Sequence, residues 1–186
     1  MLNDLLYAFW IFGPAGMANV TPILVSKIPV IKSWTLPLDF GKELHGTAIF
    51  GANKTWRGLI CGILAAELVF LLERHIAHSI SVHNFAAYLR AARFTSQPLI
   101  LGALLGCGAL VGDAVESFFK RRANRPPGST WFPFDQLDYI VGGCLFAAIV
   151  AVFPLSIYIW IIGFWFVTHL VFSYLGFLLK FKSRPI

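Results

Sequence analysis

Residues 139–179 form one apolar run that contains no Asp, Glu, Lys or Arg. As a helix rising about 1.5 Å per residue, this run is roughly twice as long as the hydrocarbon core of a bilayer, so it has to fold back. Pro154 is the natural turning point. The whole chain is 58% hydrophobic and 13% charged, against about 45–50% and about 25% in ordinary soluble domains. These features predict an all-α, polytopic integral membrane protein.

Three further apolar segments raise the expected number of transmembrane helices to five. The second is the weakest, because it is short and contains Glu67. The third carries two glycine pairs, each spaced four residues apart, which let helices approach closely. Residues 1–186 are expected to form a single membrane-embedded domain. The expected spans are 5–25, 58–72, 98–119, one ending near Phe153 and one starting at Leu155.

The distribution of Lys and Arg supports the weak second span and orients the chain. With five spans and the N-terminus outside, twelve of the fifteen basic residues lie on the cytoplasmic side. Without the second span, eight of them would lie on one side of the membrane and seven on the other. The positive-inside rule therefore favours a multi-pass protein of the cell membrane with its N-terminus outside and its C-terminus cytoplasmic. The cytoplasmic loops are expected at about 26–57 and 120–135. Nucleic acid is not expected as a partner, because topology explains the net charge of +6.

Charged side chains inside a span are costly, so those of the third span need an explanation. Asp113, Glu116, Ser117 and Lys120 fall within an arc of about 100° on a helix and share one face. This face either takes part in catalysis or binding, or forms a structural network in which Asp113 pairs with a Lys or Arg of a neighbouring helix. Glu67 stands alone and is a candidate for a hydrogen bond between packed helices.

The segment after this face combines basic and acidic residues. Lys120, Arg121 and Arg122 are followed, after a short loop, by Asp135 and Asp138. Carboxylates at i and i+3 in the first turn of a helix point the same way, and such oxygen ligands suit Mg²⁺. The alternatives are a topology signal for the basic triplet and helix capping for the aspartates.

The first cytoplasmic loop ends with the sequence Phe-Gly-Ala-Asn-Lys-Thr-Trp-Arg-Gly at residues 50–58. Its spacing differs from that of the nucleotide-binding phosphate loop. Lys54, Thr55 and Arg57 nevertheless lie at a helix start, where free N–H groups favour an anion. The alternative is a basic flank anchored by tryptophan at the membrane interface.

The sequence offers no plausible nucleophile–base pair, since no Cys or Ser is matched to a His. Carboxylates and basic side chains together indicate phosphoryl or nucleotidyl transfer, in which an anionic phosphate monoester needs no general base. Two other classes compete: a small transporter or ion channel using Asp113 and Glu67, and a structural or assembly factor without catalysis. Transport is disfavoured because the polar groups cluster on one side of the membrane and do not line its depth.

Two blocks of the sequence resemble those of the CDP-archaeol synthases, within the CTP:phosphatidate cytidylyltransferase group of membrane enzymes. One is Gly-Asp-x-x-x-Ser-Phe-x-Lys-Arg-Arg at 112–122, followed by Gly128 and by Asp-Gln-Leu-Asp at 135–138; the other is residues 50–58. The resemblance implies transfer of CMP from CTP to a lipid phosphate, with release of pyrophosphate and use of Mg²⁺, in phospholipid biosynthesis. CTP, a membrane lipid phosphate and the bilayer are the implied partners.

The resemblance also implies roles for individual residues. Ala52 stands where many relatives are expected to have an acid, and the paired glycines and extra Lys-Asp of the phosphatidate enzymes are absent between Arg122 and Asp135. These departures favour the archaeol-type branch and leave open the oligomeric state and whether the lipid is an isoprenoid ether or an acyl lipid. By position, Asp113, Asp135 and Asp138 become candidate metal ligands and, with Lys120, candidate catalytic residues. Candidate ligands of nucleotide or lipid phosphate are Asn53, Lys54, Thr55, Arg57, Ser117, Arg121 and Arg122.

Overall fold

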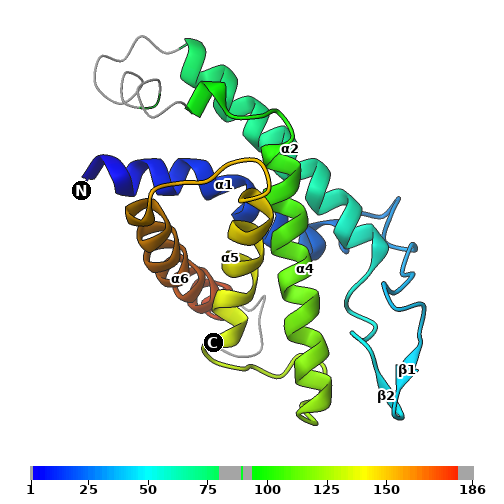
Figure 1. Ribbon diagram of the computed structural model, residues 1–186. Helices are drawn as coiled ribbons and strands as arrows, with labels where there is room; N and C mark the ends of the chain where they lie inside the picture. Colours follow the sequence, from blue (N-terminus) through cyan, green and yellow to red (C-terminus); the bar gives the residue numbers. More distant parts are fainter. Residues whose placement is uncertain (1, 80–88, 90–93, 180–186) are drawn as a thin grey trace.

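The computed structural model describes residues 2–79, 89 and 94–179 of the chain (Figure 1). This part contains five α-helices and a short antiparallel hairpin, in which Glu43 pairs with Ala48. The predicted helical class is confirmed, with the hairpin as a small addition. The elements are α1 (Leu2–Val25), β1 (Glu43–Leu44), β2 (Thr47–Ala48), α2 (Trp56–Ser79), the 3₁₀ helix η1 (Phe94–Ser96), α4 (Leu101–Arg122), α5 (Phe134–Ala147) and α6 (Leu155–Leu178).

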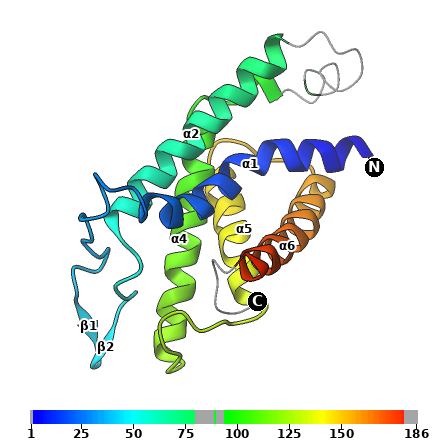
Figure 2. The ribbon, with the colours of Figure 1, turned by 180° about the vertical axis from the view of Figure 1, so that it is seen from behind.

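The first helix lies at the centre of the fold. It packs against each of the other four α-helices, and it crosses α4 in both views (Figures 1 and 2). One stripe of α1 is fully buried, through Ala8, Ile11, Phe12, Ala15 and Ala18. The spacing of three and four residues puts these side chains on one helix face, and the alanines let neighbouring helices come close. The helix thus gives α4 and α5 a common packing partner.

Helix α4 approaches its two neighbours through glycines on two faces. Gly102 and Gly106 face α2, and a Cβ on Gly106 would lie 2.5 Å from a side-chain carbon of that helix. Gly108 and Gly112 face α5, and a Cβ on Gly112 would lie 2.2 Å from the backbone oxygen of Asp138. The predicted role of both glycine pairs in close helix packing is confirmed. The second pair brings Asp138 next to the polar face of α4.

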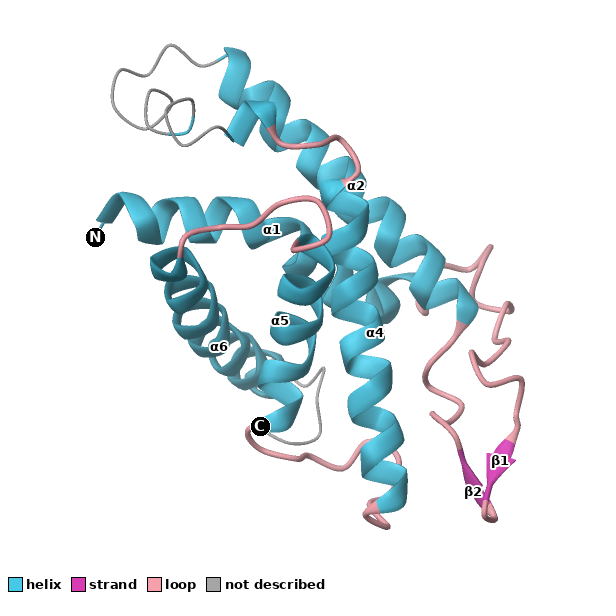
Figure 3. Cartoon of the chain, viewed as in Figure 1, coloured by secondary structure: helices cyan, strands magenta, loops and turns pink. Residues whose placement is uncertain are grey.

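Three helices in the described part are long and apolar enough to cross a membrane: α1, α4 and α6. Helix α2 carries the charged residues Glu67, Glu73 and Arg74. Helix α5 has 14 residues, which at about 1.5 Å each fall short of a hydrocarbon core of about 30 Å. Figure 3 shows helices as the dominant element, as expected for a polytopic helical protein. Of the charges used to orient the chain, those at positions 90, 93, 180, 182 and 184 lie outside the described residues.

The helix ends differ from the prediction near charged residues. Helix α4 continues through residues 120–122, which were predicted to lie in a loop, because cations at a helix C-terminus are stabilised by the helix dipole. Helix α2 extends past its predicted end at Leu72, since the Glu and Arg that follow favour helix. Helix α5 ends at Ala147, so residues 148–154 form the turn that was predicted at Pro154 alone. The basic triplet is therefore held on a helix.

Candidate active site

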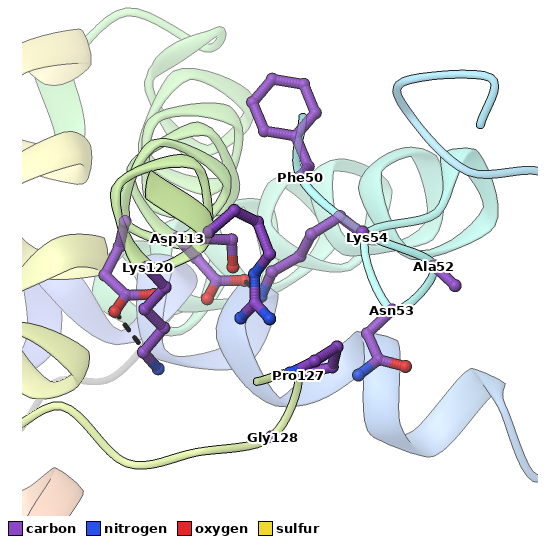
Figure 4. A pocket seen from close by; sticks show the side chains of 12 residues that line it. Phe50, Ala52, Asn53, Lys54, Asp113, Lys120, Pro127 and Gly128 are labelled. Carbon is purple, nitrogen blue, oxygen red and sulfur yellow. Dashed lines mark hydrogen bonds and ion pairs between the residues drawn. The ribbon is translucent and has the colours of Figure 1, made fainter. Parts of the chain in front are cut away.

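A polar pocket of about 150 Å³ lies beside the C-terminal end of α4. Three segments line it: the loop before α2, one face of α4, and the loop between α4 and α5. Figure 4 shows Asp113 and Lys120 on α4 across the pocket from Asn53 and Lys54, with Pro127 on a third side. The lining residues are Phe50, Gly51, Ala52, Asn53, Lys54, Asp113, Glu116, Ser117, Lys120, Arg121, Pro127 and Gly128.

The loop before α2 places Lys54 at the pocket. The N–H of Leu38 donates to the Lys54 carbonyl oxygen at 2.7 Å, which fixes the backbone there. Thr55 then caps α2, because its Oγ1 accepts the N–H of Gly58 at 3.2 Å. The Nζ of Lys54 lies 2.6 Å from Oδ2 of Asp113. Asp113 is thus paired with a lysine, as the structural alternative predicted, although this lysine lies in the loop before α2 and not on a neighbouring helix; both residues line the pocket.

Three carboxylates gather beside this ion pair. One oxygen each of Asp113, Glu116 and Asp138 lies within 4.8 Å of the other two. Asp113 and Glu116 are spaced i and i+3 on α4, and Asp138 joins them from α5 across the contact with Gly112. A set of anionic oxygen ligands fits a hard divalent cation. This cluster includes Glu116, which the resemblance did not assign, and lacks Asp135, which it did.

Asp135 faces Lys120 instead of the carboxylate cluster. Its Oδ1 accepts a hydrogen bond from the Lys120 ammonium, and its Oδ2 accepts the N–H of Trp131 at 2.7 Å. The same ammonium lies 3.2 Å from Oε1 of Glu116. Lys120 is 8% exposed, so it links two carboxylates in a buried network. Asp135 holds the lysine and the start of α5, and it touches the cluster only through Glu116.

Arg121 brings to the pocket a positive charge that no described residue neutralises. It lines the pocket and is 7% exposed. Among the described residues no carboxylate pairs with it, and its buried Nε has no hydrogen-bond partner. A buried unpaired charge is costly, and a phosphate in the pocket would pair with it. Ser117 is buried on the same helix, and Asn53 lies across the pocket, so both add polar groups.

Three predicted phosphate ligands lie outside the pocket lining and bond to backbone. Arg57 is buried and donates to the carbonyl oxygens of Ile31 and Lys32, at 3.3 and 2.7 Å. Arg122 donates to the carbonyl oxygens of the last residue of β2 and the residue after it, at 2.8 and 3.2 Å. Thr55 is the cap of α2. These side chains hold loops and a helix start next to the pocket.

Glu67 is accounted for by helix packing. Its Oε2 accepts the N–H of Ala103, in the first turn of α4, at 2.7 Å. The first N–H groups of a helix have no partner within that helix, so an acid from α2 satisfies one of them. The pocket is lined by Asp113 and not by Glu67. The packing alternative for Glu67 therefore agrees with the structure, and the ion-site alternative has no support from it.

Two acids near the pocket were not predicted as site residues. Glu116 had a usable signal, because it follows Asp113 by one helical turn on the same face. Asp39 lies before the hairpin and is 6% exposed. Its sequence neighbourhood carries no motif, and two of its three side-chain hydrogen bonds are with residues 11 and 12 positions further along.

Apolar helices beside a pocket that combines carboxylates with basic side chains fit one class of protein, a membrane-embedded enzyme. A family model described as CarS-like, CDP-archaeol synthase, matches residues 1–186. The chain belongs to the CDP-archaeol synthase family. This membership confirms the predicted family and the predicted function as a membrane enzyme of lipid biosynthesis, and it does not support the transporter alternative.

Individual relatives agree with this assignment. The CDP-archaeol synthase of Thermococcus onnurineus is 39% identical over 147 residues, which is 78% of this chain and 76% of that protein. The CDP-archaeol synthase of Pyrococcus furiosus is 31% identical over 185 residues, which is 99% of each. A solved structure described as an intramembrane enzyme for archaeal membrane lipid biosynthesis has a TM-score of 0.71 and 23% identity, covering 91% of this chain and 94% of that one. The last likeness shows that the fold is shared.

Proposed function

We propose that this chain transfers CMP from CTP to an archaeal-type lipid phosphate, producing a CDP-lipid and pyrophosphate. The observation that carries the proposal is the meeting of opposite charges at one pocket. The carboxylates of Asp113, Glu116 and Asp138 lie beside the cations of Lys54 and Arg121, at one end of a bundle of apolar helices. The names of the relatives indicate the activated lipid as CDP-archaeol.

In the proposed reaction, an oxygen of the lipid phosphate attacks the α-phosphorus of CTP. The bond between that phosphorus and the oxygen bridging to the β-phosphate breaks, and the oxygen leaves with pyrophosphate. The attacking phosphate is already anionic, so no general base is required. The protein has to hold two anionic substrates in line and offset their mutual repulsion. A pocket with several cations and no nucleophile–base pair suits this task.

The pocket-lining residues, together with Asp138 of the adjoining carboxylate cluster, divide this work. Asp113, Glu116 and Asp138 are the residues that would hold Mg²⁺, which when bound neutralises charge on the reacting phosphates. Arg121 presents a buried guanidinium that can bind a phosphate through two parallel hydrogen bonds. Lys54 adds a second cation from the opposite side of the pocket.

The remaining polar residues orient this set. Lys120 is held between Glu116 and Asp135, so it fixes the direction of the Glu116 carboxylate. Asn53 and Ser117 offer hydrogen bonds from the loop and from α4. Lys120 and Asp135 thus act on the reaction indirectly, by positioning Glu116. Lys54 and Arg121 are the residues proposed to contact the phosphates directly.

Orientation in the membrane is part of the proposal. Five spans with the N-terminus outside put the basic end of α4, and the pocket with it, on the cytoplasmic side. The accumulation of Lys and Arg at that end supports this orientation. The packing of α4 against α2 and α5, and the hydrogen bond from α4 to the Glu67 carboxylate of α2, support placing both of these helices inside the membrane bundle.

The reaction is tested by supplying purified protein with CTP, Mg²⁺ and a panel of lipid phosphates with isoprenoid ether or acyl tails. We expect pyrophosphate release and, by mass spectrometry, a CDP-lipid formed preferentially from the isoprenoid ether. Arg121→Ala should lose this activity. Arg125→Ala is the matched control, because Arg125 lies in the next loop and donates to the Thr130 carbonyl outside the pocket. Folded parent protein that releases no pyrophosphate with any lipid phosphate would overturn the proposal.

The orientation is tested by labelling single cysteines in sealed vesicles, in a background without the native cysteines. His78→Cys probes the exposed end of α2, and Ala123→Cys probes the exposed residue after α4. We expect an impermeant reagent to reach position 78 from outside and position 123 only after the membrane is opened. Labelling of both positions from the same side contradicts the five-span arrangement.

A further inference from the structure

Asp39 lies in the segment between α1 and α2, and the residue as a whole is 6% exposed. Its Oδ1 accepts the N–H of Gly41 at 3.0 Å, and its Oδ2 accepts the N–H groups of Phe50 and Gly51 at 2.9 and 3.0 Å. Burial alone raises the pKa of a carboxyl group, but these backbone N–H groups outweigh it and hold the pKa of Asp39 below its usual value. These hydrogen bonds therefore stabilise the charged form of the Asp39 carboxyl group.

The bonds to Phe50 and Gly51 reach the beginning of the pocket loop, residues 50–54. Gly51 has a φ of 97°, in the region that favours glycine, and the N–H of Lys54 donates to the Gly51 carbonyl oxygen at 3.1 Å. Next to Asp39, the N–H of Leu38 bonds to the Lys54 carbonyl oxygen. The loop is thus held at its first residues by the carboxylate and at its last residue by the adjacent backbone.

We propose that Asp39 is a positioning residue for the transfer reaction: it fixes the pocket loop so that Lys54 and Asn53 face the nucleotide. This inference rests on the proposed function, because it assigns the loop to CTP binding. The Asp39 side chain is absent from the pocket lining and acts through the loop backbone. A carboxylate suits the task better than an amide, because each of its oxygens accepts hydrogen bonds and neither donates.

The bond to Gly41 is a local turn two residues along, and on its own it would indicate only a role in starting the hairpin. The bonds to Phe50 and Gly51 span 11 and 12 residues and cross from one side of the hairpin to the other. They are the two interactions that connect Asp39 to the pocket. Removing the carboxylate therefore releases the loop, while α4 and α5 keep their own glycine-mediated contact.

The test compares Asp39→Ala and Asp39→Asn with Glu43→Ala, a matched control that removes an exposed acid from the same segment. Hydrogen bonds to a charged group stabilise the bonded arrangement strongly, and Asp39→Ala loses them. We therefore expect Asp39→Ala to raise KM for CTP by about tenfold or more. We expect kcat to change less than about threefold, because a loop that binds substrate and transition state alike alters KM alone. Asp39→Asn should lie between Asp39→Ala and the parent, and Glu43→Ala should match the parent.

Two further measurements keep the outcomes separate. Amide hydrogen exchange in Asp39→Ala should rise at Phe50 and Gly51 and stay unchanged in α4 and α5. Gly51→Ala should reproduce the rise in KM, since its Cβ meets nothing within 4 Å and only the backbone conformation is strained. A parent-like KM in Asp39→Ala, or exchange that rises throughout α4 and α5, overturns the positioning role. A parent protein without CTP turnover overturns the proposed function instead.

Discussion

Replacement of Gly112 by alanine is expected to impair catalysis far more than folding. A Cβ at this position would lie 2.2 Å from the carbonyl oxygen of Asp138 and 3.2 Å from the Cα of Gly142, both in the backbone of α5. A close contact between such carbon and oxygen atoms is normally about 3.3–3.6 Å, so α5 has to move away from α4 by about 1 Å. No side-chain rotation relieves this contact, because the obstructing atoms belong to the backbone.

The displacement moves the residue that α5 contributes to the carboxylate cluster. Asp138 is held near Asp113 and Glu116 by this close approach of the two helices. A misplacement of about 1 Å typically costs on the order of 100-fold in rate. Overpacking lowers the free energy of unfolding by about 1–3 kcal/mol, and helix propensity offsets up to about 1 kcal/mol of that loss. Gly112→Ala should therefore remain folded with about 100-fold lower activity.

The assay measures CMP transfer at saturating CTP and Mg²⁺, together with thermal unfolding in the same detergent. Gly163→Ala is the matched control, because a Cβ on this glycine of α6 would meet nothing within 4 Å. The control should keep full activity and equal or higher stability. Folded Gly112→Ala protein with activity within a few-fold of the parent would refute the idea that the glycine contact positions Asp138.

Glu116→Gln should lower the rate of Mg²⁺-dependent transfer by about 10²–10³-fold, the usual cost of one lost charge-stabilising contact. Asp135→Asn should lower the rate less, because Asp135 faces Lys120. If both variants lose the same activity across a Mg²⁺ titration, Asp135 is also a metal ligand. Lys54→Ala should raise KM for CTP with little change in thermal unfolding. An unchanged KM would mean that Lys54 does not bind CTP and serves only to orient the chain in the membrane. Lys120→Ala should lower the free energy of unfolding by roughly 3–5 kcal/mol, because this lysine is buried between two carboxylates; an unshifted unfolding curve would contradict this. Thr55→Ala should cost about 1 kcal/mol of stability without altering KM for CTP, and a raised KM at unchanged stability would make Thr55 a ligand.

The helical framework was largely predictable because its signals are local. The apolar run and Pro154 predicted the turn between the last two helices, and the glycine spacing in α4 predicted close packing. The prediction was wrong about where helices end near charged residues. Hydropathy marks how far an apolar segment extends, whereas the helix itself continues through residues 120–122 because their charges suit its C-terminus.

The site was predictable by helix face but not by the direction of each side chain. Asp135 and Asp138 are three residues apart, which separates them by about 60° around a helix. The rotation of α5, set by its glycine contact with α4, decides that Asp138 meets the cluster and Asp135 meets Lys120. The position of Arg57 in its sequence motif likewise does not predict that its side chain donates to backbone carbonyl oxygens of a loop. Asp39 was missed because its contacts depend on the path of the whole loop.

In the proposed reaction, Asp113, Glu116 and Asp138 form the divalent cation site on which transfer depends. Mn²⁺ prefers the same oxygen ligands as Mg²⁺ and can be followed by electron paramagnetic resonance, so binding can be measured without turnover. We expect that the parent and Asp135→Asn bind Mn²⁺, that Mg²⁺ displaces it, and that Asp138→Asn and Glu116→Gln bind it far more weakly. If folded Asp138→Asn and Glu116→Gln bind Mn²⁺ as tightly as the parent does, these carboxylates are not the cation site.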